Sequence, residues 1–418
     1  MSVTSNRSGM WAIFGVFFFE SSVIGQWIPR IPDIKTGLGL SDAELGMALL
    51  SMPLGTLIGF SIAGRVFHSM GLRTGCRVFL PLWALLFITP ALAQNLIQLM
   101  LALVISGFAI GMIETAMNTE AARIEKAAGK RLMSRCHGFW SIGTMVGALT
   151  GGLIAHQGIA VDTHFVMTMP LIAIGGYFVA TALPRLPSED QGLTLSTVST
   201  LSTDVDGETD GSLQDSGDAR LFALPGKAIL LLCIMPLGIM MVEGAFIDWS
   251  AVFMRDVMSA SPLLIAVTYS FFSIVMAVVR LWGDTISAKF GETAVIRASG
   301  LAATVGIGLF ALAPNPFWVF VAAAIAGAGV AIVFPLAVTA AANRPGRSSA
   351  DNVAALNMVA FTAFLIAPPI IGFLSEAVGL RYALFSLAPI AFLTFLLAEE
   401  GGEKKTADEL RTETSSTR

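Results

Sequence analysis

The sequence predicts an all-α membrane protein with twelve transmembrane helices in two six-helix bundles, and three observations carry this prediction. Of its 418 residues, 55% are hydrophobic and 13% charged, and the mean hydropathy of +0.76 is too high for a water-soluble chain of this length. The apolar residues form runs of about 20 or more, the length that a helix needs to cross a bilayer. One polar stretch, 184–225, divides these runs into two sets of six.

Each apolar run is bounded by charged residues, Gly or Pro, and is interpreted as one membrane span. The predicted spans are 10–32, 43–67, 76–94, 96–122, 136–157, 163–183, 226–254, 262–288, 293–313, 316–342, 351–377 and 380–398. Glu20 interrupts the first run and no small-residue cleavage site follows it, so this run is interpreted as a retained span and not as a signal peptide.

The polar stretch is rich in Ser, Thr, Gly, Asp and Glu, and it cannot bury enough apolar surface to fold alone. We therefore expect an N-terminal bundle at 1–183, a cytoplasmic linker at 184–225, and a C-terminal bundle with a short cytoplasmic tail at 226–418. With a cytoplasmic N-terminus, the cytoplasmic segments hold all of the 25 Lys and Arg residues except Arg30, Lys35, Arg255 and Arg381. This asymmetry predicts an inner-membrane protein with both termini in the cytoplasm.

Composition and motifs exclude several classes of function. The net charge is −4, and no dense basic run with interleaved aromatic residues predicts a nucleic-acid partner. Cys76, Cys136 and Cys233 are far apart, so we expect no disulfide framework, metal site or cofactor. No HExxH, GxSxG or paired-Asp motif lies in any span, which argues against an enzyme.

A duplication is visible in the loops that follow the second and eighth spans. Gly64 and Gly71 follow the second span, and Gly283 and Gly291 occupy the matching place after the eighth, with a spacing that differs by one residue. The repeat is weak because Gly is common in membrane helices, but its place in the matching loop of each half favours two related bundles.

The first of these loops carries a family resemblance. It reads Gly-Arg-Val-Phe-His-Ser-Met-Gly-Leu-Arg and resembles the loop of the major facilitator superfamily, Gly-x-x-x-Asp-Arg-x-Gly-Arg-Lys, which latches that family's cytoplasmic gate. Gly64, Gly71 and Arg73 fit the pattern, whereas His68 and Ser69 stand at its acidic and basic positions. The resemblance implies a gating role for the three residues that fit and an altered charge relay in this half.

A second resemblance is to the fucose permeases and their sugar-transporter relatives. Glu114-Thr115-Ala116-Met117-Asn118 is similar to their Glu-Thr-Ala-Ala-Asn, and Phe334-Pro335 is similar to their Tyr-Pro. In that branch the fourth-span Glu is linked to substrate and protons, and the resemblance implies this role for Glu114. The first-span Asp of the permeases would fall at Gly25, so that part of their pattern is missing.

Three acidic residues lie near the middle of predicted spans. These are Glu20, Glu114 and Glu243. A charge at the bilayer centre costs about 3 kcal/mol on insertion scales, so each is expected to face a partner or a watery cavity. One alternative is a structural carboxylate bonded to a neighbouring helix; the other is a proton carrier that loads outside and releases inside.

Polar and aromatic residues of the same spans complete the candidate substrate site. Asn118 follows Glu114 by four residues and shares its helix face, which suits a hydroxyl-bearing solute. Gln26 either lines the cavity or bonds across helices, and Trp140 and Asn357 either contact the solute or serve in packing.

Four further residues are candidates for gating. Asp248 and Trp249 are assigned to the outer end of the seventh span, as a gate or an interface anchor, since Glu243 and Asp248 would point about 140° apart on a regular helix. Arg280 and Asp284 are spaced to form an i,i+4 pair, either as a latch in the C-terminal half or as a structural ion pair.

The sequence thus predicts a monomeric secondary transporter that moves a small polar, sugar- or polyol-like solute by alternating access, in symport with protons. A proton-driven drug or metabolite exporter is the main alternative. A transporter-derived sensor is a further one, although the polar termini and linker are too short for a folded output domain.

Overall fold

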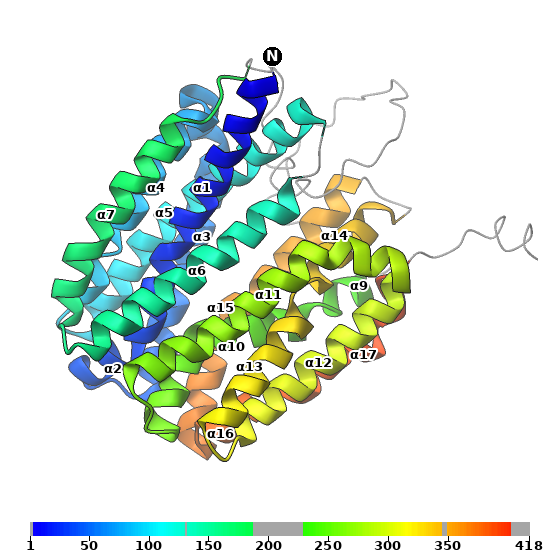
Figure 1. Cartoon of the computed structure of the whole chain (residues 1–418). Helices are drawn as coiled ribbons and strands as arrows, with labels where there is room; N and C mark the ends of the chain where they lie inside the picture. The colour runs from blue at the N-terminus through cyan, green and yellow to red at the C-terminus, as the bar shows by residue number, and fades with distance from the viewer. Residues whose placement is uncertain (1–2, 130–131, 187–228, 345–348, 403–418) are drawn as a thin grey trace, which may run out of the picture.

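The computed structural model describes residues 3–129, 132–186, 229–344 and 349–402, and within these ranges the chain is helical, without strands (Figure 1). The linker predicted at 184–225 falls almost entirely outside the described residues, as does most of the predicted C-terminal tail.

The N-terminal half is built from long helices with short connections. Its elements are α1 (Val3–Trp27), η1 (Ile28–Arg30), α2 (Ile31–Leu38), α3 (Asp42–Met70), α4 (Leu72–Leu86), η2 (Thr89–Leu92), α5 (Leu96–Ala128), α6 (Met133–His156) and α7 (Val161–Thr181).

The C-terminal half repeats this plan with more interruptions. Its elements are α9 (Leu230–Ile234), α10 (Leu237–Val252), the π-helical turn η3 (Phe253–Val257), α11 (Pro262–Phe290), α12 (Glu292–Leu312), α13 (Pro316–Val330), α14 (Val333–Ala342), α15 (Ser349–Val378), α16 (Leu380–Phe385), α17 (Leu387–Leu396) and η4 (Ala398–Glu400).

The described part of the chain contains eleven helical segments that are long and apolar enough to cross a membrane, and Leu380–Leu396 adds a shorter one. These correspond in order to the twelve predicted spans and confirm the all-α membrane fold. Large apolar side chains such as Leu171, Phe178 and Trp282 stand exposed on the helix surfaces, as expected of a protein that contacts lipid.

Local sequence sets the helix boundaries. Ser41 and Glu44 form a capping box at the start of α3, because the Ser41 side chain accepts from the Glu44 N–H and Glu44 bonds back to the Ser41 N–H. Gly71 and Gly291 have positive φ angles of 78° and 81° and start α4 and α12. Their near-identical conformation, with ψ of 150° and 146°, supports the duplication seen in the sequence.

Close helix pairs in the N-terminal half depend on glycine. α3 packs along α5 and α1 along α6. A Cβ at Gly107 would lie 2.0 Å from the Met52 carbonyl oxygen, and one at Gly147 would lie 2.4 Å from that of Ser22. Only glycine fits at these backbone contacts.

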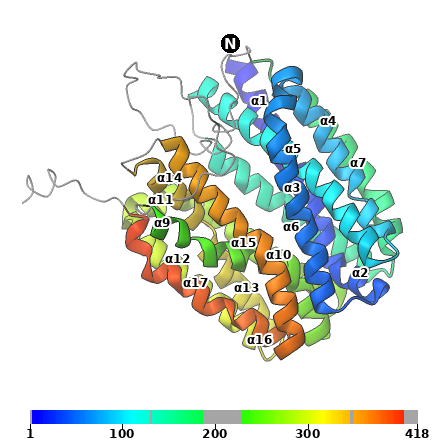
Figure 2. The same ribbon diagram turned by 180° about the vertical axis from the view of Figure 1, so that it is seen from behind.

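The two halves lie side by side and meet along α6 with α11 and along α3 with α15 (Figures 1 and 2). On α6, Gly143 and Gly147 face α1 within the same half, whereas a Cβ at Gly152 would meet Ala266 of α11. The glycines spaced by four are therefore packing residues inside the N-terminal half, and a different face of α6 forms the boundary between the halves.

Candidate functional site

Glu20 and Glu114 lie near each other in the N-terminal half. Glu20 sits on α1 and is fully buried, and within the described part of the chain no cation pairs with its carboxylate, which lies beside the Trp140 side chain. Glu114, on α5, is half-buried and close enough for the two carboxylates to repel each other. The indole N–H of Trp83 donates to the backbone oxygen of Glu20 at 3.2 Å, so α1 is held but the carboxylate is not. A buried carboxylate without a partner is costly unless it takes up a proton or meets a ligand.

Trp140 and Asn118 border this pair. Trp140, on α6, is half-buried and near the Glu20 carboxylate. It directly precedes Ser141, which contacts α11 of the other half. The Asn118 amide donates to the backbone oxygen of Glu114 at 2.9 Å, and its side chain is half-buried. The predicted stripe of Glu114 and Asn118 therefore borders the same part of the N-terminal half as Glu20.

Gln26 has protein partners on two other helices. Its Nε2 donates to Thr150 Oγ1 at 2.8 Å, and its Oε1 lies 2.7 Å from Nε2 of His164. Of the two alternatives for Gln26, bonding across helices is the one that the structure supports, because the buried amide joins α1 to α6 and α7. Sequence reasoning missed His164, although a histidine inside an apolar run is itself a signal.

Glu243 has a partner of opposite charge in the C-terminal half. Arg280 Nη2 lies 3.1 Å from Glu243 Oε1, its Nε donates to the carbonyl of Ala331 at 3.2 Å, and its Nη1 lies 3.5 Å from Ser141 Oγ. The Ser273 hydroxyl also donates to the Ser141 carbonyl at 2.8 Å. Arg280 thus links a carboxylate of its own half to the other half of the molecule. The side chain of Asp284 lies outside what the structure describes, so the pair predicted for Arg280 and Asp284 stays a prediction.

The remaining candidates of the C-terminal half are less clearly placed. Asp248 and Asn357 are half-buried, on α10 and α15. Trp249 is fully buried, so it is not an anchor exposed at the membrane interface, and the gating role of Asp248 and Trp249 stays a prediction. The seventh span is interrupted before Pro236, so Glu243 and Asp248 share one continuous helix and keep the divergent directions expected for a spacing of five.

The end of the molecule that carries α2, here called the α2 end, holds an ion-pair network between the halves. Arg255 Nη2 lies 2.6 Å from Asp33 Oδ1, and Lys35 Nζ lies 2.6 Å from Asp256 Oδ2. Lys35 also pairs with Asp42 at 2.5 Å within its own half. The π-helical turn η3 presents Arg255 and Asp256 to α2, a local distortion of the kind common at functional sites.

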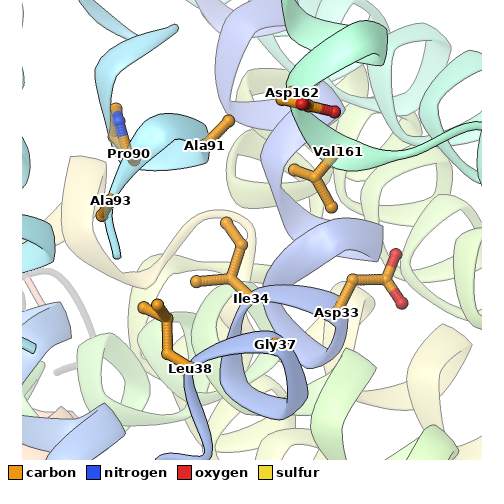
Figure 3. Close-up of a pocket in the computed structure, with 9 residues that line it drawn as sticks. All are labelled: Asp33, Ile34, Gly37, Leu38, Pro90, Ala91, Ala93, Val161 and Asp162. Carbon is orange, nitrogen blue, oxygen red and sulfur yellow. The ribbon is translucent and has the colours of Figure 1, made fainter. Parts of the chain in front are cut away.

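Two further contacts extend this network, since Ser375 donates to Asp42 and the Ala43 N–H donates to Glu376 Oε1 at 3.2 Å. A pocket of about 210 Å³ opens beside α2, η2 and α7, with the carboxylates of Asp33 and Asp162 on its wall (Figure 3). Asp33 therefore borders open space on one side. The sequence signal for this network was the small number of basic residues predicted outside the cytoplasm. Three of these four, Arg30, Lys35 and Arg255, lie in the network or beside it.

Gly64, Gly71 and Arg73 lie at the opposite end. Gly64 is inside α3 and Gly71 separates α3 from α4. Arg73 Nε and Nη2 donate to the carbonyls of Leu183 and Thr181 at 2.7 and 2.6 Å, so Arg73 bonds the end of α7 in its own half. Their gating role stays a prediction.

A family model, the Major Facilitator Superfamily, matches residues 10–364. The chain belongs to the Major Facilitator Superfamily. Members of this superfamily move small solutes across membranes and are not enzymes, so the protein is a multi-pass membrane transporter.

Two relatives match most of this chain and most of their own length. The chain is 30% identical over 382 residues to the uncharacterized transporter y4wD of Sinorhizobium fredii, covering 91% of this chain and 95% of that protein. It is 27% identical over 384 residues to the membrane protein MosC of Rhizobium meliloti, covering 90% and 86%.

Solved structures of superfamily members share the fold. The nucleoside transporter NupG superposes with a TM-score of 0.67 at 13% identity, covering 94% of this chain and 99% of that one. The E. coli fucose:proton symporter FucP superposes with a TM-score of 0.60 at 15% identity, covering 94% and 98%. At these identities the likeness concerns the fold alone.

Proposed function

We propose that this superfamily member carries a small polar, hydroxyl-rich solute in symport with protons, and that the solute binds between the two halves beside Glu114, Asn118 and Trp140. The observation that carries the proposal is the contrast between two buried acids. Glu243 is compensated by Arg280, whereas no described cation stands beside Glu20, which lies near a second acid, Glu114. A proton on one of the two acids removes their repulsion and the cost of burying a charge.

Proton uptake at this pair couples to the solute because both use the same groups. Glu114 is half-buried, and its protonated carboxyl donates a hydrogen bond that its charged form cannot. A solute hydroxyl bound to Glu114 and Asn118 is then held more tightly when the proton is present. Trp140 supplies an apolar face for the carbon skeleton of a sugar or polyol.

The direction of the cycle follows from the orientation that the basic residues predict. With the N-terminus in the cytoplasm, the α2 end faces outward, and the ion pairs of Asp33 with Arg255 and of Lys35 with Asp256 close the outer gate. In the proposed cycle, this closed outer gate belongs to the state that exchanges solute and proton with the cytoplasm. Fucose:proton symport by FucP and nucleoside transport by NupG, which share the fold, favour hydroxyl-rich solutes.

Uptake into proteoliposomes tests the proposal. Aldoses, alditols, nucleosides, sugar acids and amino sugars are offered at equal concentration, with and without an inward proton gradient. A hydroxyl-rich neutral solute should accumulate only with the gradient, and Glu114→Gln and Glu20→Gln should abolish accumulation. Glu44→Gln, at an exposed carboxylate that caps α3, is the matched control and should leave uptake unchanged.

The outcomes separate the alternatives. Solute uptake that is the same with an inward, an outward or no proton gradient would refute proton coupling. Loss of preloaded solute from the lumen under the same inward gradient, or accumulation when the gradient is reversed, with the same dependence on Glu114, would establish a proton-driven exporter in place of the symporter.

A further inference from the structure

The tenth span is broken at Ala331 and Ile332, and Pro335 explains where the break falls. In a continuous helix the carbonyl of Ala331 would accept from the N–H four residues later, at position 335. Proline has no N–H, so this carbonyl loses its helical donor. The ladder resumes one residue on, where the Leu336 N–H donates to the Ile332 carbonyl at 3.2 Å.

The vacated carbonyl is used by a side chain from another helix. Arg280 of α11 donates its Nε to the Ala331 oxygen at 3.2 Å. The guanidinium is planar, and fixing Nε on one side therefore fixes the directions of both Nη groups. Nη2 then meets Glu243 Oε1 at 3.1 Å, and Nη1 points across the boundary to Ser141 Oγ at 3.5 Å.

The anchor matters because Arg280 stands where the two halves meet. Its side chain is 15% exposed, and that of its partner Glu243 is 9% exposed. Ser141, the residue it approaches in the other half, directly follows Trp140, so Arg280 contacts the helix that carries part of the site that the proposed function assigns to the solute. Holding a long flexible cation in one geometry costs rotamer entropy, and the hydrogen bond to a fixed acceptor offsets that cost.

We propose that Pro335 is a positioning residue: it leaves the Ala331 carbonyl free to hold Arg280, and this aims the Arg280 charge at Glu243 and at the boundary between the halves. Pro335 acts through a missing backbone donor, and its effect on Glu243 passes through Arg280. The proposal predicts that restoring a donor at position 335 releases Arg280, whereas removing the proline ring alone does not.

Two substitutions at position 335 separate these effects. Pro335→Ala supplies an N–H for the Ala331 carbonyl and draws it into line with the helix axis. L-lactic acid at position 335, introduced by nonsense suppression, has the same methyl group as Ala but an ester oxygen in place of the N–H. Lactic acid should therefore preserve the Arg280 anchor and Ala should not.

The first measurement is a thermal double-mutant cycle on purified protein in detergent, which needs no solute. In the wild type, Pro335→Ala replaces the bond from Arg280 Nε to the Ala331 carbonyl with a bond from the new backbone N–H. In the Arg280→Lys background there is no Nε bond to lose, so the same substitution only adds the backbone bond. The melting temperature should therefore respond more favourably to Pro335→Ala in the Arg280→Lys background, and lactic acid should show no such difference. Pro170→Ala, inside α7, is the control and should act equally in both backgrounds.

The second measurement uses the solute found by the uptake screen. Pro335→Ala should raise the half-saturation concentration severalfold, and Arg280→Lys should do the same, with no further rise in the double variant and with recovery by lactic acid. Equal thermal effects of Pro335→Ala in both backgrounds would overturn the positioning role, and so would a lactic acid variant that behaves like the Ala variant. Because the thermal cycle is independent of transport, its failure is distinct from failure of the proposed function.

Discussion

Asp33 of α2 and Arg255 of η3 are joined across the two halves by an ion pair of 2.6 Å. Asp33 also accepts from Arg30 Nη1 at 2.9 Å, so one carboxylate is shared between a cation of its own half and one of the other half. If the α2 end opens during the cycle, Asp33 keeps Arg30 and gives up Arg255. The carboxylate therefore stays compensated when the halves separate.

Reversing the charge of one partner should open the α2 end. Arg255→Asp places two carboxylates together, and the pair is partly exposed, so we expect a loss of about 1 kcal/mol, which is roughly a fivefold shift toward the open state. Spin labels at Thr36→Cys and Pro314→Cys should report a longer distance. The native cysteines Cys76, Cys136 and Cys233 are buried, which favours selective labelling.

A charge-conserving variant controls for general damage. Arg255→Lys keeps a cation opposite Asp33 and should retain much of the closed population, and unlike a charge exchange it leaves the pair of Asp33 with Arg30 intact. The exposed pair of Arg297 and Glu399 lies within the C-terminal half, and reversing both of its charges should leave the label distance unchanged. If Arg255→Lys opened the α2 end as much as Arg255→Asp, the ion pair would have no part in the gate.

The unpartnered Glu20 carboxylate makes a stability prediction. Its neutral analogue, Glu20→Gln, avoids the cost of a buried charge. At pH 8 it should increase the unfolding free energy of the detergent-solubilised protein by about 1–3 kcal/mol, which a higher melting temperature would report. At pH 5 a protonated carboxyl resembles the amide, so the difference should shrink. A gain of equal size at both pH values would mean that folding changes no proton binding at Glu20 over this range, and would contradict proton uptake by the buried carboxylate.

The physics of the bilayer made the membrane spans predictable from the sequence. Every backbone polar group in lipid needs a partner within the protein, so each long apolar run is a helix. Interruptions were harder to place. Pro236 marks the break in the seventh span, whereas Gly244, although glycine also weakens a helix, lies inside continuous α10.

The candidate site was predictable residue by residue but not pair by pair. The acids stood out because charges are rare in spans. The sequence does not reveal that Arg280 pairs with Glu243, whereas no described cation pairs with Glu20. Such pairs depend on the rotation of each helix and on how the halves meet. The ion pair of Lys35 with Asp256 was missed for the same reason, since its members are distant in the chain and look like ordinary loop charges.

Replacing only one member of the pair of Glu243 and Arg280 should reduce stability more than replacing both. Arg280→Met leaves a mostly buried carboxylate without a partner and should destabilise the protein by about 3 kcal/mol. The double variant Arg280→Met with Glu243→Met loses both charges and should be more stable than Arg280→Met alone. Chemical denaturation or thermal melting in detergent measures both, and Arg297→Met, in an exposed pair, provides the small reference effect.

The contact between α3 and α5 predicts a strict requirement for glycine. A methyl group at Gly107 would lie 2.0 Å from the Met52 carbonyl oxygen, and backbone has no rotamer with which to move away. Gly107→Ala should therefore force the two helices apart and cost about 1–3 kcal/mol of stability. Gly37→Ala meets nothing within 4 Å on the short helix α2 and should be neutral or slightly stabilising, because alanine favours helix. If both variants melted at the wild-type temperature, α3 and α5 would have to be less closely packed than the structure has them, and the placement of Glu114 on α5 would be in question too.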